Sequence, residues 1–407
     1  MGAENSKDKI RKLNKIVSGT NLLYNIKSKY IMKQIIDNLQ KIKTLKLINY
    51  NKSLREKLEI SIDDYKEYSL IKIELIPKDQ KITSNIFINY NKKEKKYFHI
   101  YFDDQKEEIN RNYFIWNDDV KKVKIIIDSK IKSFNNLFSE SICIKTINFI
   151  NLKRSNITNM NRMFFNCLVE NINFNSFNTS QVTDMSSMFY NCSLLKTLDL
   201  SSFNTINLQN MHNMFNGCKS LKELNISNFN TKNVLNMTFV FYECKLLKNL
   251  DVSNFFTDKV IDMSYMFSNC ESLNYLNLSS FNTSNVTDIK HMFSNCGSLK
   301  ELNLSNFNTK KVIDMNAMFF NCKSIKILNL SNFITDNVTN FSNMFNNCNS
   351  LIKLNLNNFE INKSAKMKDM FKGCISLKEI KVKNINDFTR KNYNIYSDIS
   401  RNVKIIT

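Results

Sequence analysis

The sequence predicts an α/β solenoid, a stack of similar coils, over most of its 407 residues. Nine cysteines recur from Cys167 to Cys374, with a first interval of 25 residues and later intervals of 26. Eight phenylalanines from Phe177 to Phe359 keep a 26-residue interval throughout. Each repeat also reads as a strand followed by a short helix. Self-similarity at such a period is typical of solenoids, in which every repeat forms one coil.

The strand and the helix of a coil are predicted from the spacing of apolar residues. Leu302 and Leu304 alternate with polar residues, which is the period of a half-buried strand. Later in the same repeat, apolar residues at spacings of three and four predict one face of a short helix: Val312, Met315, Met318, Phe319 and Cys322. Asp314 precedes this run and is expected to cap the helix. The asparagines of residues 306–311 are expected to turn the corner in left-handed conformations.

The wording of the repeats resembles a known family. The spacing L-x-x-L-x-L recurs in phrases such as MFYNCSLLKTLDLSSFNT (Met188–Thr205) and MFSNCESLNYLNLSSFNTSNVTDI (Met266–Ile289). Phrases of this kind extend over residues 137–383 and resemble the BspA-like leucine-rich repeat family. The resemblance implies a leucine-rich-repeat-like stack that presents one long sheet face. Because members of that family are best known on cell surfaces, it also suggests an adhesin as one alternative.

The remaining segments suggest caps at both ends of the stack, since the exposed end of a repeat array must hide its core. Helical periodicity precedes the β-rich pattern, so the expected cap region at the N-terminus is helical and then β-rich. The predicted organisation is a basic tail (1–27), a helical segment (28–67), a small β-rich region (68–120), the solenoid (121–383) and a C-terminal cap (384–407).

The first residues suggest contact with a membrane surface. Met1–Ser6 fits the M-G-x-x-x-[ST] pattern for N-myristoylation of Gly2. Residues 1–50 carry 11 Lys/Arg and 3 Asp/Glu, so a basic segment can supply the second signal that binding to an anionic membrane requires. We find no secretory signal and no apolar run long enough for a transmembrane helix. The expected location is therefore cytoplasmic, with membrane association if Gly2 is acylated.

Residues 28–60 resemble an F-box, the segment that binds the adaptor of cullin-type ubiquitin ligases. The resemblance is carried by the spacing I-I-x-x-L, with Ile35, Ile36 and Leu39 at the positions implied to contact the adaptor. The family's leading Leu-Pro is absent. The alternative is a helical cap with no adaptor.

The sheet face offers candidate contacts for a protein partner. Two outward rows of Asn/Asp and Ser are nearly uniform, which favours a structural role through stacked amides. A third row varies from coil to coil, as a surface that reads a specific target would. Its predicted partner-binding residues are Glu223, Tyr275, Glu301, Ile327 and Lys353.

A basic stripe runs beside that row at the start of the strands. It consists of Lys196, Lys222, Lys248, Lys300, Lys326 and Lys378. Such a stripe can attract an acidic partner, or it can simply keep the edge solvated and block lateral pairing. The phenylalanines that could stack on bases belong to the predicted core, which argues against nucleic acid as the partner.

No catalytic or metal-binding constellation stands out. His99, His212 and His291 have no recurring Cys or carboxylate partner, the five glycines cannot form a phosphate loop, and no CxxC or Cys/His cluster predicts zinc. No cofactor is implied. The favoured function is a non-catalytic protein-interaction scaffold. The alternatives are an F-box/leucine-rich-repeat substrate receptor of a cullin-type ubiquitin ligase and a BspA-like surface adhesin.

Overall fold

The computed structural model describes residues 70–78, 86–152, 156–175, 177–390 and 393–407. The chain divides into two compact units, Met1–Leu70 and Ile71–Thr407, and the description that follows concerns the second. Several predictions lie outside the described residues: the basic tail 1–27, the helical segment 28–67, acylation of Gly2, and adaptor contacts by Ile35, Ile36 and Leu39.

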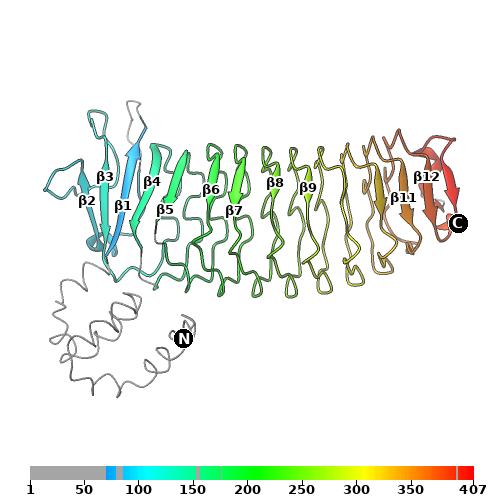
Figure 1. Ribbon diagram of the computed structural model, residues 1–407, viewed down its shortest axis with the longest axis horizontal. Helices are drawn as coiled ribbons and strands as arrows, with labels where there is room; N and C mark the ends of the chain where they lie inside the picture. The colour runs from blue at the N-terminus through cyan, green and yellow to red at the C-terminus, as the bar shows by residue number, and fades with distance from the viewer. Residues whose placement is uncertain (1–69, 79–85, 153–155, 176, 391–392) are drawn as a thin grey trace, which may run out of the picture. The chain divides into compact units, whose positions relative to one another are not determined.

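Within Ile71–Thr407, the repeats form a solenoid with about one strand per coil (Figure 1). Neighbouring strands pair in parallel with an offset of one repeat, as in Thr197↔Glu223 and Ile327↔Lys353. Buried and exposed residues alternate along them, which confirms the strand prediction for most coils. The strands of the repeats are β5 (Asn171–Phe174), β6 (Thr197–Asp199), β7 (Glu223–Asn225), β8 (Asn249–Leu250), β9 (Tyr275–Leu276), β10 (Ile327–Asn329), β11 (Lys353–Leu356) and β12 (Glu379–Val382).

The short helix predicted for each coil is wrong. Residues 315–322 form a run of turns, and the only helical segments among the described residues are short 3₁₀ turns. These are η2 (Lys95–Tyr97), η3 (Ile385–Phe388) and η4 (Ile395–Ser397). The fold is therefore a β-solenoid with almost no helix.

Hydrogen bonding between coils explains why no helix forms. The N–H of Phe319 donates to the carbonyl of Met344 in the next coil at 2.9 Å, whereas the N–H of Cys322 donates to Phe319 of its own coil at 3.1 Å. Ala317 and Asn321 have φ angles of 51° and 59°, in the left-handed region that an α-helix does not contain. The run thus buries the apolar residues that a helix would bury, while half of its N–H groups bind the neighbouring coil.

Asparagine adopts the left-handed conformation, but not where the sequence analysis expected it. None of the residues 306–311 has a positive φ, whereas Asn295 and Asn321, each directly before a cysteine, do. In the corner itself, Asn306 acts through its side chain. Its Nδ2 donates to the carbonyl of Leu278 in the preceding coil at 2.9 Å.

Phenylalanine rings form the centre of the core. Their centroids lie 5.5–5.8 Å apart and their planes are nearly parallel. From Phe189 onward, this stack consists of Phe189, Phe215, Phe241, Phe267, Phe293, Phe319, Phe345 and Phe371, and Phe164 and Phe138 continue it toward the N-terminus. The recurrent cysteines lie beside it as free, buried thiols. The thiol of Cys296, for example, donates to the carbonyl of Phe267 at 3.1 Å.

The N-terminal end of this unit is an antiparallel sheet that continues into the solenoid. Its strands are β1 (Ile71–Pro77), β2 (Phe98–Phe102), β3 (Val123–Ile127) and β4 (Ile144–Asn151), in the order β2-β3-β1-β4. β4 then pairs in parallel with β5, so the core is continuous from one sheet to the other.

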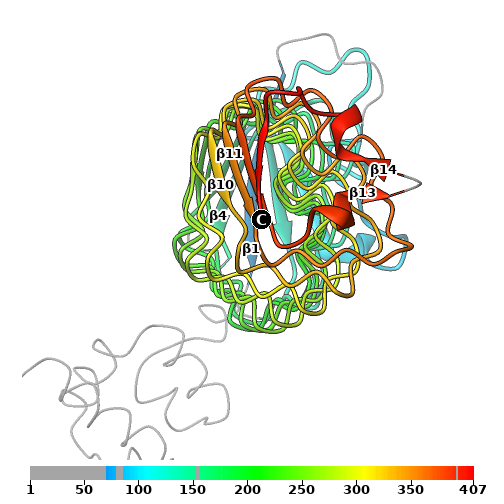
Figure 2. The same ribbon diagram turned by 90° about the vertical axis from the view of Figure 1, so that its right-hand side faces the viewer.

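The last coil is covered by the C-terminal residues. β15 (Lys404–Ile406) pairs in parallel with β12. The hairpin β13 (Thr389–Arg390) and β14 (Tyr393–Asn394) precedes it. In the end-on view, β4, β10 and β11 lie along one side of the coil and the hairpin lies on the opposite side (Figure 2).

Candidate binding face of the solenoid

The strands present the predicted partner-binding row on the surface. Glu223, Tyr275, Ile327 and Lys353 are the first residues of β7, β9, β10 and β11. Tyr275 and Ile327 expose 62% and 65% of their surface, which is unusual for large apolar side chains in an otherwise polar row. Glu301 is also exposed but belongs to no strand.

The strand ladder is interrupted at Glu301. Residues 301–304 form no strand, so β8–β9 and β10–β11–β12–β15 are separate sheets. Leu302, which the alternation places in the core, is only partly buried there. The sequence of this coil matches its neighbours, and the interruption is visible only in the structure.

A surface hollow of about 590 Å³ lies at this interruption. Its lining comes from three successive coils: Lys300, Glu301, Ser324, Lys326, Ile327 and Ser350. The structure thus brings together two residues of the variable row and two lysines of the basic stripe. Volumes of this order are typical of sites that hold small molecules or single large side chains.

Sequence reasoning missed the two serines of the hollow. Ser324 donates from its hydroxyl to the carbonyl of Gly297 at 2.6 Å. Gly297 takes the position directly after the cysteine, where Lys219 and Lys245 stand in other coils, and a Cβ added there would meet nothing within 4 Å. The glycine at position 297 is therefore the one feature of the sequence that could have indicated a hollow in this region.

The other predicted residues lie apart from the hollow. Glu223 and Tyr275 project from strands on its N-terminal side. Lys353 forms an ion pair with Glu379 in the next coil at 3.6 Å, so its charge is partly used within the sheet. The candidate site is therefore narrower than the row that the sequence suggested.

The basic stripe keeps its charges free for contact. All six lysines are exposed: Lys196, Lys222, Lys248, Lys300, Lys326 and Lys378. None of them forms an ion pair with another residue of the described ranges. Lys300, Lys326 and Glu301 are the charged residues that line the hollow.

The uniform rows of the sheet face have a local structural role. Asn277 accepts the N–H of Ser279 through its Oδ1 at 3.1 Å, and the same bond follows most strands. It closes the turn that ends the strand. Side-chain amide bonds between coils occur mainly at the left-handed asparagines instead, where Asn321 donates to Asn295 at 2.7 Å.

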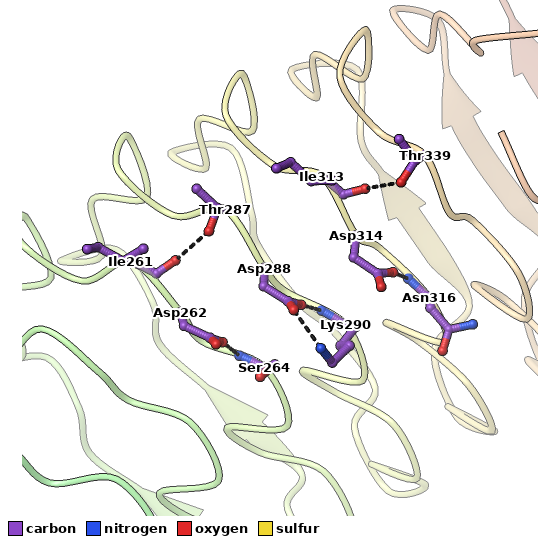
Figure 3. A network of polar contacts seen from close by, with 10 residues as sticks. All are labelled: Ile261, Asp262, Ser264, Thr287, Asp288, Lys290, Ile313, Asp314, Asn316 and Thr339. Atoms are coloured by element: carbon purple, nitrogen blue, oxygen red, sulfur yellow. Dashed lines mark hydrogen bonds and ion pairs between the residues drawn. The ribbon is translucent and has the colours of Figure 1, made fainter. Parts of the chain in front are cut away.

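A second polar row runs along the parallel bridges of the coils (Figure 3). Asp314, the predicted helix cap, accepts the N–H of Asn316 at 2.8 Å and so opens the turn run rather than a helix. Asp288 accepts the N–H of Lys290 at 2.9 Å and forms an ion pair with its Nζ at 2.7 Å. These carboxylates thus accept hydrogen bonds from backbone N–H groups. Among the described residues, no group of three or more His, Cys, Asp or Glu is arranged to hold a metal ion.

The comparisons with known proteins place the chain in a family. A family model described as "Mycoplasma protein of unknown function, DUF285" matches residues 132–225, 217–326 and 295–404. The chain belongs to the DUF285 family. The matched segments contain the span 137–383, where the wording of the repeats resembles BspA-like leucine-rich repeats. None of them reaches the F-box-like segment 28–60.

Solved structures similar to this DUF285 chain include three leucine-rich repeat or receptor proteins. A leucine-rich repeat protein from Bacteroides ovatus is 17% identical, covering 71% of this chain and 89% of that one, with a TM-score of 0.23. The TLR13–ssRNA13 complex is 15% identical, covering 62% and 42%, with a TM-score of 0.24. The plant peptide hormone receptor RGFR1 with RGF2 is 13% identical, covering 58% and 47%, with a TM-score of 0.22.

Nothing about partners passes from these proteins to the DUF285 chain. The search of the curated proteins found no match. Within the described part of the chain, no helix is long and apolar enough to cross a membrane.

Proposed function

We propose that this protein is a non-catalytic protein-binding repeat protein, and that its principal contact site is the hollow around Ile327. The observation that carries the proposal is the hollow itself. It combines an exposed apolar side chain, two lysines without an ion pair among the described residues, and two serines, beside the described repeat coil that lacks its strand, residues 301–304.

The chemistry of the lining suits a protein ligand with an apolar anchor beside acidic groups. Ile327 is the apolar residue of the lining and is exposed, and apolar or aromatic side chains that a partner buries dominate protein interfaces. Lys300 and Lys326 surround it with positive charge, which favours carboxylates at the rim and speeds encounter with an acidic segment.

The surroundings of the histidines and cysteines support a non-catalytic role. His99 faces Glu108 on the exposed surface at 3.1 Å, whereas His212 contacts Asn210 and His291 stacks on Tyr265. Burial raises the pKa of thiols such as that of Cys296 to about 12, so a thiolate nucleophile is disfavoured. None of these groups lies in the hollow.

The experiment compares proteins purified with a C-terminal tag from the native cell. Ile327→Asp places a charge in the hollow, whereas Ile313→Asp changes a half-exposed isoleucine in the preceding coil that does not line it. We expect a stoichiometric partner with the wild type and with Ile313→Asp, and its loss with Ile327→Asp. Equal recovery with both variants would reject the hollow as the contact site.

A further inference from the structure

A rigid loop projects from the N-terminal sheet, which we call the Trp116 loop (residues 103–119). Arg111 and Asp118 close it with two parallel N–H···O bonds of 2.6 Å each. Asp118 also accepts the N–H of Ile115 at 2.7 Å, and the N–H of Asp118 donates back to the carbonyl of Ile115 at 3.0 Å. A bidentate pair of this kind fixes geometry as well as adding energy.

The ion pair is itself held by the core of the sheet. The guanidinium of Arg111 lies 5.0 Å from the ring centroid of Phe102, a buried residue of β2, and 5.9 Å from that of Tyr113. The side chain of Asp118 is largely buried. The loop is therefore ordered before it meets anything, which lowers the entropic cost of binding.

Trp116 projects from this rigid loop into solvent. It exposes 78% of its surface and is the only tryptophan in the chain. Ile115 and Tyr113 beside it are also exposed. Tryptophan is among the residues that contribute most to protein interfaces when buried by a partner. A preorganised, exposed tryptophan therefore indicates a docking element.

The charge of the loop identifies the kind of surface that it fits. Residues 103–119 contain six acidic and two basic residues, a net charge of −4, in a chain whose formal net charge is +21. An acidic loop is repelled by anionic lipid and by nucleic acid. It is complementary to an apolar recess that is rimmed by lysines.

The hollow around Ile327 is such a recess. Lys300 and Lys326 border it, and its volume of about 590 Å³ is ample for an indole ring. The loop cannot reach the hollow of its own chain, since β5 to β9 and the coil of Glu301 lie between β4 and β10. At about 4.8 Å per coil, the seven steps from β4 to β10 alone span about 34 Å along the solenoid.

We propose that Trp116 of one copy inserts into the hollow of a second copy, with the acidic groups of the loop against Lys300 and Lys326. This inference rests on the proposed function, because it names the partner of the same hollow. The two contact surfaces differ, so the contact is heterologous: it builds a head-to-tail chain of copies or closes a ring of three or more.

The single tryptophan gives a direct test with the full-length protein. Ile327→Asp keeps Trp116 as a fluorescent reporter but has a disabled hollow, whereas Trp116→Ala keeps the hollow and is free of tryptophan. Titrating Trp116→Ala into Ile327→Asp should shift the tryptophan emission to the blue and saturate at one to one. The double variant Trp116→Ala/Ile327→Asp, titrated in its place, should produce no shift.

Sedimentation velocity supplies the second readout. The wild type should grow beyond a dimer as its concentration rises, each single variant should stay monomeric, and their mixture should stop at the dimer. Phe256→Ala, which removes another exposed aromatic ring, should associate like the wild type.

A wild type that stays monomeric, or a Trp116 emission that the intact hollow does not shift, would overturn the inference. Loss of a different partner on Ile327→Asp would still support the proposed function, so the two hypotheses fail separately. Association that survives Ile327→Asp but not Trp116→Ala would reject the hollow as the acceptor.

Discussion

The side chain of Thr283 makes hydrogen bonds to the next coil of the kind that paired strands make through their backbones. Its hydroxyl donates to the carbonyl of Asn308 in the next coil at 2.9 Å and accepts the N–H of the same residue at 2.8 Å. The hydroxyl therefore satisfies both backbone groups of one residue. The bond pair repeats along the solenoid at Thr179, Thr205, Thr231, Thr257, Thr309 and Thr335.

Removing this hydroxyl should destabilise the protein. Thr283→Val keeps the shape of a buried side chain but leaves two backbone groups without a partner, which costs about 1–3 kcal/mol. Thr283→Ser keeps the hydroxyl and is the matched control. Urea unfolding measures both. A valine variant as stable as the serine variant would show that the bond pair contributes nothing.

The phenylalanine stack should dominate stability. The ring centroid of Phe293 lies 5.8 Å from those of Phe267 and Phe319, and the side chain is fully buried. Phe293→Ala should therefore lower the free energy of unfolding by about 3–5 kcal/mol. Phe256 exposes half of its surface, and Phe256→Ala should change the free energy of unfolding by less than about 0.5 kcal/mol. Similar losses for the two variants would contradict the stack as the core.

Stability should fall in alkaline solution because of the buried thiols. Burial raises the pKa of Cys218 and Cys296 to about 12, from a reference value of 9.0. Between these pH values the unfolded chain binds fewer protons than the folded one, so the free energy of unfolding decreases as pH rises. This contribution is complete below pH 9 and is lost toward pH 12, at up to about 1.4 kcal/mol per pH unit for each thiol.

Urea unfolding at neutral and alkaline pH, with a reductant present, measures this slope. Cys296→Ala should reduce the dependence of the free energy of unfolding on pH by the contribution of one thiol. A slope that does not change on removal of the cysteine would show that its thiol does not titrate in this range.

Two glycines should respond in opposite ways to alanine. A Cβ at Gly297 meets nothing, so Gly297→Ala should be neutral or stabilise by about 0.4–1 kcal/mol through the unfolded chain. Gly373 has a φ of 78°, and a Cβ there would press on the amide of Asn347. Gly373→Ala should therefore lower the melting temperature. Equal melting temperatures for the two variants would refute the left-handed strain at Gly373.

Sequence periodicity was sufficient to predict the solenoid, its strands and its buried ladders. It failed for the predicted helix because Met315, Met318, Phe319 and Cys322 are buried by the turn run as well as by a helix. The distinguishing signal was Asn321, since an asparagine or glycine recurs before most of the cysteines, where a left-handed residue is needed.

The hollow could be predicted only in part. Ile327 and Glu301 stood out in the variable row, and Lys300 and Lys326 in the basic stripe, but sequence alone placed Tyr275 and Lys353 with them. Only the four residues of the hollow lie beside the missing strand at residues 301–304. The absence of this strand depends on how three coils pack together, and no local sequence pattern predicts it. Trp116 was missed because the sequence of residues 113–116 resembles a strand, whereas Trp116 lies in a turn.

The missing strand also has a mechanical consequence. At Glu301 the coil is joined to its neighbours through the turn run, the threonine bonds and the phenylalanine stack, but not through paired strands. Among the described repeat coils, strand pairing is also absent between β5 and β6 and between β7 and β8, but only the Glu301 coil lacks it on both sides, so the solenoid should be weak under a pulling force along its axis at this coil. A ligand that contacts Lys300, Lys326 and Ser350 would connect the three coils that meet here. Binding in the hollow would therefore make the solenoid more resistant to extension.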